Sequence, residues 1–322
     1  MYQVNHIGVL TSGGDAPGMN AAIRAVVRKS IFHGLQVAGI KRGYLGLLKK
    51  EFVNYSLGSV ADIIHRGGTI LHTARCEEFK TEEGQRTAVK NLQEEGIDAL
   101  VVIGGEGSMR GAFALSKYGV PVVGIPATID NDLVGTEFSI GFDTAVNNVV
   151  DAINKIRDTA TSHERVFIIE VMGRKTGQIA LYAGLAGGAE SILLPEIDLD
   201  MNEVIFKLER GMNRGKLHSI IIVAEGAASA IEVGDEIRKR TGLETRITIL
   251  GHLQRGGTPT ALDRMLASRM GAKAVELLLQ GANRKMVGIA AGELLALDLE
   301  DVLSREKVLD RSIWELAAVL AI

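Results

Sequence analysis

Short runs of β-branched and aliphatic residues alternate along the chain with longer segments in which apolar residues recur every three or four positions. The first run, His6–Leu10, predicts a strand, and the amphipathic segment Met19–Phe32 after it predicts a helix. Further strands are expected at Ala99–Ile103, Val120–Ile125, Val166–Val171, Ser191–Leu194, Ser219–Ala224 and Ile247–Leu250, and further helices at Ser108–Lys117, Thr144–Ala160, Asn202–Arg214, Ile231–Lys239 and Leu262–Leu279. Regular alternation of strand and helix is typical of a parallel sheet covered by helices, so the chain is predicted to be an α/β protein.

The 322 residues are enough for two ordinary domains that each bury a core. No tract rich in proline, serine or charge separates the halves, and no fixed-period repeat is present. We therefore predict two doubly wound, Rossmann-like lobes with mainly parallel sheets and a boundary near Gly141 that no linker marks. In such sheets, ligands bind at the carboxyl ends of the strands, so the loops after the strands are where chemistry is expected.

Charge and cysteine content narrow the class of protein. With 36 basic and 39 acidic residues the net charge is −3, which provides no global field for nucleic acid or anionic lipid. The longest charge-free stretch, Thr176–Ala189, has 14 residues, fewer than the roughly 18 to 20 that a membrane span needs. The single Cys76 cannot form an intrachain disulfide and, with no secretory signal, indicates a reducing compartment. We expect a cytoplasmic protein that binds neither nucleic acid nor membrane.

A glycine-rich loop follows the first predicted strand. It contains Gly13 and Gly14, and Pro17 is placed for the first turn of the next helix. Paired glycines let backbone N–H groups approach an anion, and the helix N-terminus adds partial positive charge. The loop is neither G-x-G-x-x-G nor G-x-x-x-x-G-K-S/T, so a dinucleotide site or a Walker A loop is not supported. Phosphate binding and a tight turn without ligand both stay open.

A second glycine-rich loop, Gly104–Ser108, follows the strand at Ala99–Ile103 and carries Glu106 between glycines. An exposed carboxylate at a strand end can hold Mg²⁺ beside the phosphates of a nucleotide, because Mg²⁺ takes one or two carboxylates together with phosphate oxygens. The alternative is a helix N-terminal glutamate stabilised by the helix dipole.

The strand at Val120–Ile125 leads into a segment with two carboxylates, Asp130 and Asp132. In an extended segment both would point to the same side, where they can act as a base and its electrostatic partner in removing a hydroxyl proton. The alternative is a loop capped by aspartate and asparagine side chains.

The second half of the chain places cations at predicted strand ends. Guanidinium groups there suit bidentate phosphate contacts, so this half is a candidate for binding a phosphorylated molecule, although ion-paired surface arginines remain the alternative. Glu225 is an acceptor for sugar hydroxyls, or else part of a structural ion pair. The cationic candidates are Arg165, Arg174, Arg246, His252 and Arg255.

Five blocks together carry a specific resemblance. They are LTSGGDAPGMNAAIR from Leu10, VVIGGEGS from Val101, PATIDND from Pro126, IEVMGRKTG from Ile169 and GHLQRGGTPTALDR from Gly251. The chain resembles the bacterial ATP-dependent 6-phosphofructokinases over nearly its whole length. The match weakens at 282–286, and no role is carried over there. The resemblance implies a nucleotide-binding lobe at 1–141, with about 254–304 packing back on it, and a sugar-phosphate-binding lobe at 142–253, with about 305–322.

The resemblance implies transfer of a phosphoryl group from ATP to the 1-hydroxyl of fructose 6-phosphate, with Mg²⁺. Asp130 would take the hydroxyl proton, and Arg174 would neutralise charge on the moving group. The full catalytic set implied is Gly14, Thr128, Asp130, Asp132 and Arg174; the ATP-binding set is Gly14, Tyr44, Arg75, Cys76, Glu106, Gly107 and Ser108, with Glu106 also the metal ligand. The implied sugar-phosphate set is Thr128, Asp130, Arg165, Met172, Gly173, Arg174, Glu225, Arg246, His252 and Arg255.

Assembly and regulation are also implied by the resemblance. The family forms homotetramers in which the counterparts of Arg165 and Arg246 reach across from a neighbouring subunit. A separate effector site would bind ADP or GDP as activator and phosphoenolpyruvate as inhibitor. Its matching residues are Arg24, Arg28, Arg157, Glu190, Arg214 and Lys216. On the residues alone, a solvated basic face is the competing interpretation; Arg24 and Arg28 share one helix face because they are four residues apart.

Three alternative functions compete with the one that the resemblance implies. Diphosphate-dependent relatives typically carry Asp at position 107 and Lys at 127, where this chain has Gly107 and Ala127. Kinases of NAD or lipids share a similar glycine loop but have no counterpart of PATIDND or GHLQRGG. The third rival is a catalytically weakened sensor of sugar phosphates or nucleotides. Departures from the family pattern keep it open: Glu106 for Asp, Ala127 for Gly and Gln178 for Asp.

Overall fold

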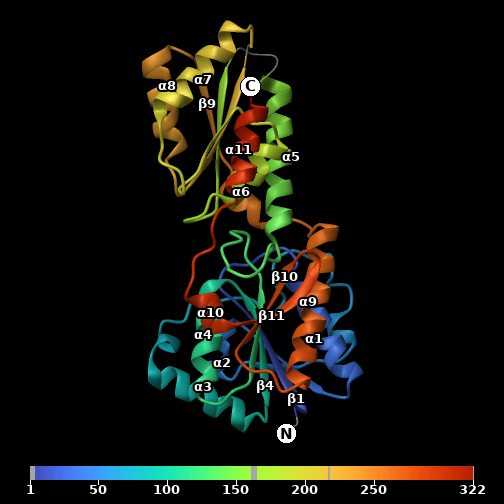
Figure 1. Cartoon of the computed structure of the whole chain (residues 1–322). Helices are drawn as coiled ribbons and strands as arrows, with labels where there is room; N and C mark the ends of the chain where they lie inside the picture. The colour runs from blue at the N-terminus through green and yellow to red at the C-terminus, as the bar shows by residue number, and fades with distance from the viewer. Residues whose placement is uncertain (1–3, 161–164, 217, 322) are drawn as a thin grey trace. The chain divides into compact units, whose positions relative to one another are not determined.

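The computed structural model describes residues 4–160, 165–216 and 218–321 (Figure 1). The chain divides into two units. Unit 1 contains residues 1–128, 132–143 and 255–307, and unit 2 contains 129–131, 144–254 and 308–322. The chain therefore passes between the units several times.

Unit 1 is built on a seven-stranded sheet with the strand order β11-β10-β5-β4-β1-β2-β3. Strands β10, β5, β4, β1 and β2 run parallel, whereas β3 and β11 pair antiparallel at the two edges. The strands are β1 (His6–Ser12), β2 (Gln36–Ile40), β3 (Phe52–Asn54), β4 (Ala99–Gly104), β5 (Val122–Pro126), β10 (Lys285–Ala290) and β11 (Glu293–Asp298). The helices are α1 (Met19–Phe32), α2 (Gly43–Lys49), α3 (Glu82–Glu94), α4 (Glu106–Ser116), α9 (Ala261–Leu279) and α10 (Leu299–Leu303), with 3₁₀ turns at Gly58–Val60 and Glu78–Lys80.

Unit 2 is built on a four-stranded parallel sheet with the order β7-β8-β6-β9. Its strands are β6 (Val166–Val171), β7 (Ser191–Leu193), β8 (Ser219–Ala224) and β9 (Thr245–Ile249). Its helices are α5 (Phe142–Ala160), which starts in unit 1, α6 (Gln178–Ala186), α7 (Met201–Asn213), α8 (Ala230–Thr241) and α11 (Arg311–Leu320), with a 3₁₀ turn at Gly251–Arg255.

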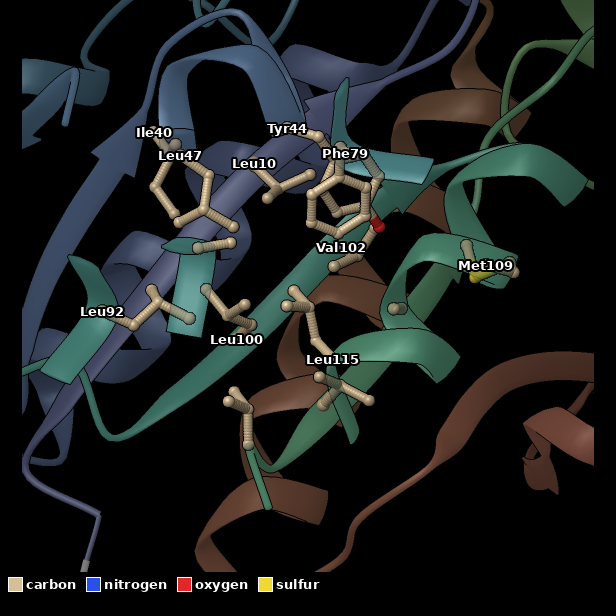
Figure 2. Close-up of a cluster of buried hydrophobic side chains, with 14 of the residues drawn as sticks. Leu10, Ile40, Tyr44, Leu47, Phe79, Leu92, Leu100, Val102, Met109 and Leu115 are labelled. Carbon is tan, nitrogen blue, oxygen red and sulfur yellow. The ribbon is translucent and has the colours of Figure 1, made fainter. Parts of the chain in front are cut away.

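The core of unit 1 is aliphatic, as a composition with 46% hydrophobic but only 4% aromatic residues requires. Leu100 and Val102 on β4 pack with Leu10 on β1 and Leu115 on α4 (Figure 2). The central parallel strands are covered on both faces, so every residue of β1 and β4 is buried. That burial explains their near-continuous apolar sequence.

The predicted fold class is confirmed, and the strongly periodic elements lie within a few residues of their predicted bounds. The prediction missed the strands β2, β3, β10 and β11 and the helices α2, α3, α6, α10 and α11. Helix α3 contains few apolar residues, β2 is only five residues long, and the edge strand β11 is largely exposed on both faces. Helix α11 was missed although its apolar residues recur with helical spacing. Strands β10 and β11 fall where the family resemblance fades. None of the helices in the described residues is long and apolar enough to span a membrane.

We predict that Leu100→Ala destabilises the protein by about 2–5 kcal/mol, because it leaves a cavity at a fully buried position in the β4 core. Denaturant unfolding of the variant and the parent measures the difference. Leu57→Ala is the matched control, since the Leu57 side chain is largely exposed. Equal losses for the two variants would contradict the assignment of the core.

Candidate functional site

The two glycine-rich loops lie side by side in unit 1. Strands β1 and β4 pair in parallel, with Ser12 opposite Gly104, so both loops leave the sheet at the same edge. A Cβ built on Gly104 would lie 2.4 Å from Ser108 Oγ and 2.4 Å from the Ser12 carbonyl oxygen. Gly13 has a φ of 83°, which favours glycine. Only residues without side chains allow this close approach of backbone and hydroxyl.

Ser108 supplies a buried polar atom in this space. Its hydroxyl oxygen is buried and makes no hydrogen bond to the described residues. An unmade hydrogen bond at a buried group is costly, and such groups mark places where a ligand or water completes the bonding. A phosphate oxygen would accept a hydrogen bond from the Ser108 hydroxyl here, beside the N-terminus of α4. The geometry therefore fits an anion.

Tyr44 shapes this loop from within the protein. Its hydroxyl donates to the Ser108 carbonyl oxygen at 2.6 Å, and its ring stacks on Phe79 with centroids 4.1 Å apart (Figure 2). Burial raises the pKa of Tyr44 far above its ordinary value, so the phenol stays neutral and keeps its donor. Tyr44 thus fixes the Ser108 turn, and its ring is enclosed by protein.

Glu106 is the first residue of α4, and its carboxylate is half-exposed. Arg110, one turn later, donates to Glu106 Oε1 from both Nε, at 2.9 Å, and a terminal nitrogen, at 2.5 Å. The same terminal nitrogen also reaches the Leu303 carbonyl oxygen at 3.5 Å, at the end of α10. Oε2 of Glu106 takes no hydrogen bond from the described residues, so one carboxylate oxygen is open to a cation.

The other predicted nucleotide residues occupy different positions in unit 1. Arg75 and Gly107 are exposed, and Cys76 is half-buried against the unit 1 core. Arg255, which was predicted on the sugar side, lies beside the first glycine loop: a Cβ built on Gly14 would be 2.5 Å from its guanidinium nitrogen. That nitrogen donates to the Asp15 carbonyl oxygen at 3.1 Å. A cation therefore borders the candidate anion site.

Asp130, in unit 2, is the most buried of the predicted catalytic carboxylates, at 2% exposure. Its Oδ2 lies 3.4 Å from Nε of Arg174, whose own side chain is largely exposed. Thr176 was missed: its hydroxyl donates to the Asp130 carbonyl oxygen at 3.0 Å. The guanidinium of Arg174 thus places a positive charge beside this buried carboxylate.

The prediction of an extended segment around the two aspartates is wrong. Residues 129 and 130 form a turn, and Asn131 has a φ of 51°. A non-glycine residue in the left-handed region is strained unless its surroundings hold it, and Asn131 is fully enclosed. The segment that carries Asp130 and Asp132 is therefore a turn and not an extended strand.

The loop after β6 is held by side-chain contacts to its backbone N–H groups. Oε1 of Glu225 accepts from the backbone N–H groups of Gly173, at 3.2 Å, and Arg174, at 2.8 Å. The N–H of Met172 donates to Oε1 of Gln254 at 3.1 Å, and Gln254 is only 1% exposed. Gln254 was missed as a positioning residue, and no local pattern in its glycine-rich segment marks it.

Three predicted sugar-phosphate residues remain, all on unit 2. Arg165 donates from Nε to Oε2 of Glu244 at 2.7 Å, and Arg246 pairs with the other oxygen of the same carboxylate. The structure therefore brings Arg165 and Arg246 together through Glu244, which the sequence did not single out. His252 is exposed in the 3₁₀ turn.

The predicted effector residues fall on both units. Arg24 and Arg28 lie on α1 of unit 1, Arg28 being exposed. In unit 2, Lys216 pairs with Glu190, and Arg157 donates to the Gly187 and Gly188 carbonyl oxygens at 2.6 and 2.9 Å. Arg214 bonds the Arg210 carbonyl oxygen at 3.3 Å.

Residues 4–160, 165–216 and 218–321 contain no group of three His, Cys, Asp or Glu side chains that could hold a metal by themselves. A metal ion at Glu106 would therefore need ligand oxygens from a second molecule. That requirement agrees with the habit of Mg²⁺, which binds one or two carboxylates plus phosphates and water.

The sequence of this chain is similar to those of known proteins. The phosphofructokinase family model matches residues 6–278. The chain is 60% identical to the ATP-dependent 6-phosphofructokinase of Halothermothrix orenii, covering 98% of this chain and 99% of that one. It is 59% identical to the enzyme of the same name from Bacillus subtilis, covering 99% and 100%.

Solved structures show the same fold. The phosphofructokinase of Pichia pastoris in the T-state has a TM-score of 0.89 at 36% identity; the match covers 99% of this chain but 39% of that longer one. A pyrophosphate-dependent phosphofructokinase from Marinobacter aquaeolei has a TM-score of 0.86 at 24% identity, covering 96% and 86%, which shows the fold alone. With a matching family model over most of its length and full-length relatives near 60% identity, this chain belongs to the phosphofructokinase family.

Proposed function

We propose that this protein transfers the γ-phosphoryl group of ATP to the 1-hydroxyl of fructose 6-phosphate, giving ADP and fructose 1,6-bisphosphate. The observation that carries the proposal is the buried Asp130 with the Arg174 guanidinium beside it, in a chain about 60% identical to ATP-dependent 6-phosphofructokinases. A carboxylate that can take a proton next to a cation is what phosphoryl transfer to an alcohol requires.

The nucleotide belongs to the glycine loops of unit 1. Backbone N–H groups near Gly13 and Gly14, the Ser108 hydroxyl and the N-terminus of α4 provide donors for its phosphates. Arg255 adds a positive charge at the first loop. Glu106 would hold Mg²⁺ through Oε2, and the bound ion would neutralise phosphate charge and orient the γ-phosphoryl group.

The transfer forms one oxygen–phosphorus bond and breaks one. The 1-hydroxyl oxygen attacks the γ-phosphorus, the bond to the β,γ-bridging oxygen breaks, and the hydroxyl proton passes to Asp130. A carboxylate of ordinary basicity is a weak base toward an alcohol, so it receives the proton late, as the new bond weakens the O–H bond. Arg174, whose exposed side chain lies next to Asp130, neutralises charge on the transferring group.

The sugar phosphate belongs to the cationic loops. The 6-phosphate would be bound by Arg246, Arg165 and His252, and Glu225 would accept hydrogen bonds from the sugar hydroxyls. In a homotetramer, Arg165 and Arg246 would complete the site of a neighbouring subunit. Their shared partner Glu244 supports this assignment, because one carboxylate keeps both guanidiniums near each other and leaves their other nitrogens for phosphate. A cytosolic location is part of the same proposal.

A coupled assay with purified protein, ATP, Mg²⁺ and fructose 6-phosphate tests the proposal. Turnover of ATP with formation of fructose 1,6-bisphosphate is the expected result. Binding of both ligands without turnover would support a sensor instead, and turnover with diphosphate in place of ATP would support the diphosphate-dependent class. The absence of Asp at 107 and Lys at 127 argues against that class.

Asp130→Asn is expected to lower kcat by roughly 10²- to 10⁴-fold with little change in substrate affinity, because the amide cannot take the hydroxyl proton. Steady-state kinetics with both substrates varied measures it. Asp151→Asn is the matched control, since Asp151 lies on the exposed face of α5. A loss of less than about tenfold in Asp130→Asn would remove Asp130 from this role.

Arg110→Gln is expected to raise the affinity of the ADP-bound enzyme for Mn²⁺ by about 2- to 5-fold. The substitution frees Glu106 from its ion pair and removes a cation beside the metal. Electron spin resonance of free Mn²⁺ measures the affinity without turnover. Arg86→Gln breaks a similar exposed pair on α3 and is the control.

The Glu106→Gln background adds a second check on this prediction. There, removal of Arg110 should have no effect on Mn²⁺ affinity, because the carboxylate through which Arg110 acts is gone. Unchanged or weaker Mn²⁺ binding in Arg110→Gln alone would contradict the competition between the guanidinium and the metal.

An effector site for nucleoside diphosphates and phosphoenolpyruvate is proposed around the Lys216–Glu190 pair and Arg157. Lys216→Ala should then reduce activation by GDP, measured as the ratio of rates with and without GDP at low fructose 6-phosphate. Lys239→Ala, which removes an exposed lysine on α8, should keep the parental ratio. A parental enzyme that does not respond to GDP or phosphoenolpyruvate would show that this site is not used.

A further inference from the structure

Lys307 is a half-buried lysine that the proposed mechanism does not use. It lies in the loop between α10 and α11, at the end of unit 1. Its ammonium donates to the carbonyl oxygens of Thr136, at 2.8 Å, and Glu137, at 3.1 Å. These acceptors are consecutive residues of the segment that follows Asp132. A single cation therefore bridges two neighbouring carbonyls of a loop.

The segment that Lys307 contacts is also held by hydrogen bonds to other parts of unit 1. Ala127 and Ile140 form an isolated parallel bridge, and the Ser139 hydroxyl donates to the Thr128 carbonyl oxygen at 2.7 Å. The N–H of Ile289, on β10, donates to the Thr136 hydroxyl oxygen at 3.2 Å. Residues 127–140 thus form a loop with a fixed base, and Lys307 holds the part beyond Asp132.

Two opposing effects act on the charge of the Lys307 ammonium. Burial lowers the pKa of Lys307 to about 8, while the nearby carboxylates of Asp132 and Glu137 act in the opposite direction. On its own loop the neighbouring charged residues, Arg305 and Glu306, are exposed. Because attraction between charges is mutual, the ammonium also stabilises the carboxylate charge of Asp132.

We propose that Lys307 is a positioning residue for phosphoryl transfer: its ammonium fixes the Thr136 and Glu137 carbonyls and faces Asp132 with a positive charge, so that the rate depends on its protonation. This inference rests on the proposed function, because it assigns Lys307 to the loop of the predicted catalytic carboxylates. Lys307 acts through that loop and is not itself placed on a substrate.

The sign of the pH effect follows from the direction of the shift. The ammonium is present below pH about 8 and is lost as the pH rises through that value. In the unfolded chain the amine keeps its ordinary pKa of 10.5, so between these values the unfolded state binds more protons and this group favours folding as pH rises. Titration of Lys307 therefore does not unfold the protein as the pH rises, so a fall in kcat above pH 8 that came from Lys307 would not be caused by unfolding.

Three variants measured from pH 6.5 to 9.5 test the proposal. Lys307→Met should lower kcat by about tenfold or more at pH 7 with KM for ATP nearly unchanged, and should lose the alkaline decline near pH 8. Lys307→Arg should restore much of the activity and retain it through pH 9.5, because guanidinium does not titrate there. Lys285→Met removes a partly exposed lysine of unit 1 and should behave as the parent.

Hydrogen exchange supplies a readout that does not depend on turnover. Amides of residues 132–139 should exchange faster in Lys307→Met than in the parent, while those of β4 stay protected. A Lys307→Met enzyme with parental kcat and pH profile would overturn the proposal, and so would a Lys307→Arg enzyme that keeps the parental decline near pH 8. A parental protein without turnover would instead refute the proposed function, and the exchange result would still decide whether Lys307 holds the loop.

Discussion

The parallel pairing of β4 with β1 on one side and β5 on the other is the constraint on which the unit 1 site depends. It sets Gly104 opposite Ser12 in one register and opposite Pro126 in the other. Three loops therefore leave the sheet together: the first glycine loop, the Glu106 loop and the segment that leads to the aspartates. A shift of register by one residue would turn every side chain of β4 to the other face and separate these loops.

Neighbouring atoms lie so close to Gly104 and Gly14 at this edge that a side chain would not fit. This close approach, and not a need for flexibility, explains why glycine stands at these positions. At Gly104 a side chain would collide with both a hydroxyl and a carbonyl oxygen, and at Gly14 it would displace the Arg255 guanidinium. The Ser108 hydroxyl and the Ser12 carbonyl oxygen lie beside Gly104, and the Arg255 guanidinium lies beside Gly14. Such a lining suits the oxygens of a phosphate chain and offers little to an apolar ligand.

The sequence predicted the scaffold and marked the loops that carry the candidate site, because both leave local signals. Buried parallel strands such as β4 appear as uninterrupted apolar runs, and glycines after strands mark anion loops. The geometry around Asp130 was not predicted, since its turn depends on Asn131 being held in a left-handed conformation by the surrounding fold. Gln254, Thr176 and Glu244 act through contacts with residues 46 to 82 positions away or through shared partners, and no local pattern reports such contacts.

Glu106 shows how a departure from a family pattern can be absorbed by its neighbours. The extra methylene of glutamate carries the carboxylate about an ångström or more farther than aspartate would, and near-octahedral Mg²⁺ tolerates such a shift poorly. Arg110 binds Oε1 and also reaches the last carbonyl of α10, so it draws the carboxylate back along α4. Helix α10 packs against α4 and offers the negative end of its dipole to the guanidinium. The longer side chain and the arginine one turn later therefore form a pair in which the guanidinium occupies Oε1. In the proposed metal site, Arg110 would compete with a bound cation for the carboxylate charge and would leave Oε2 as the oxygen that meets it.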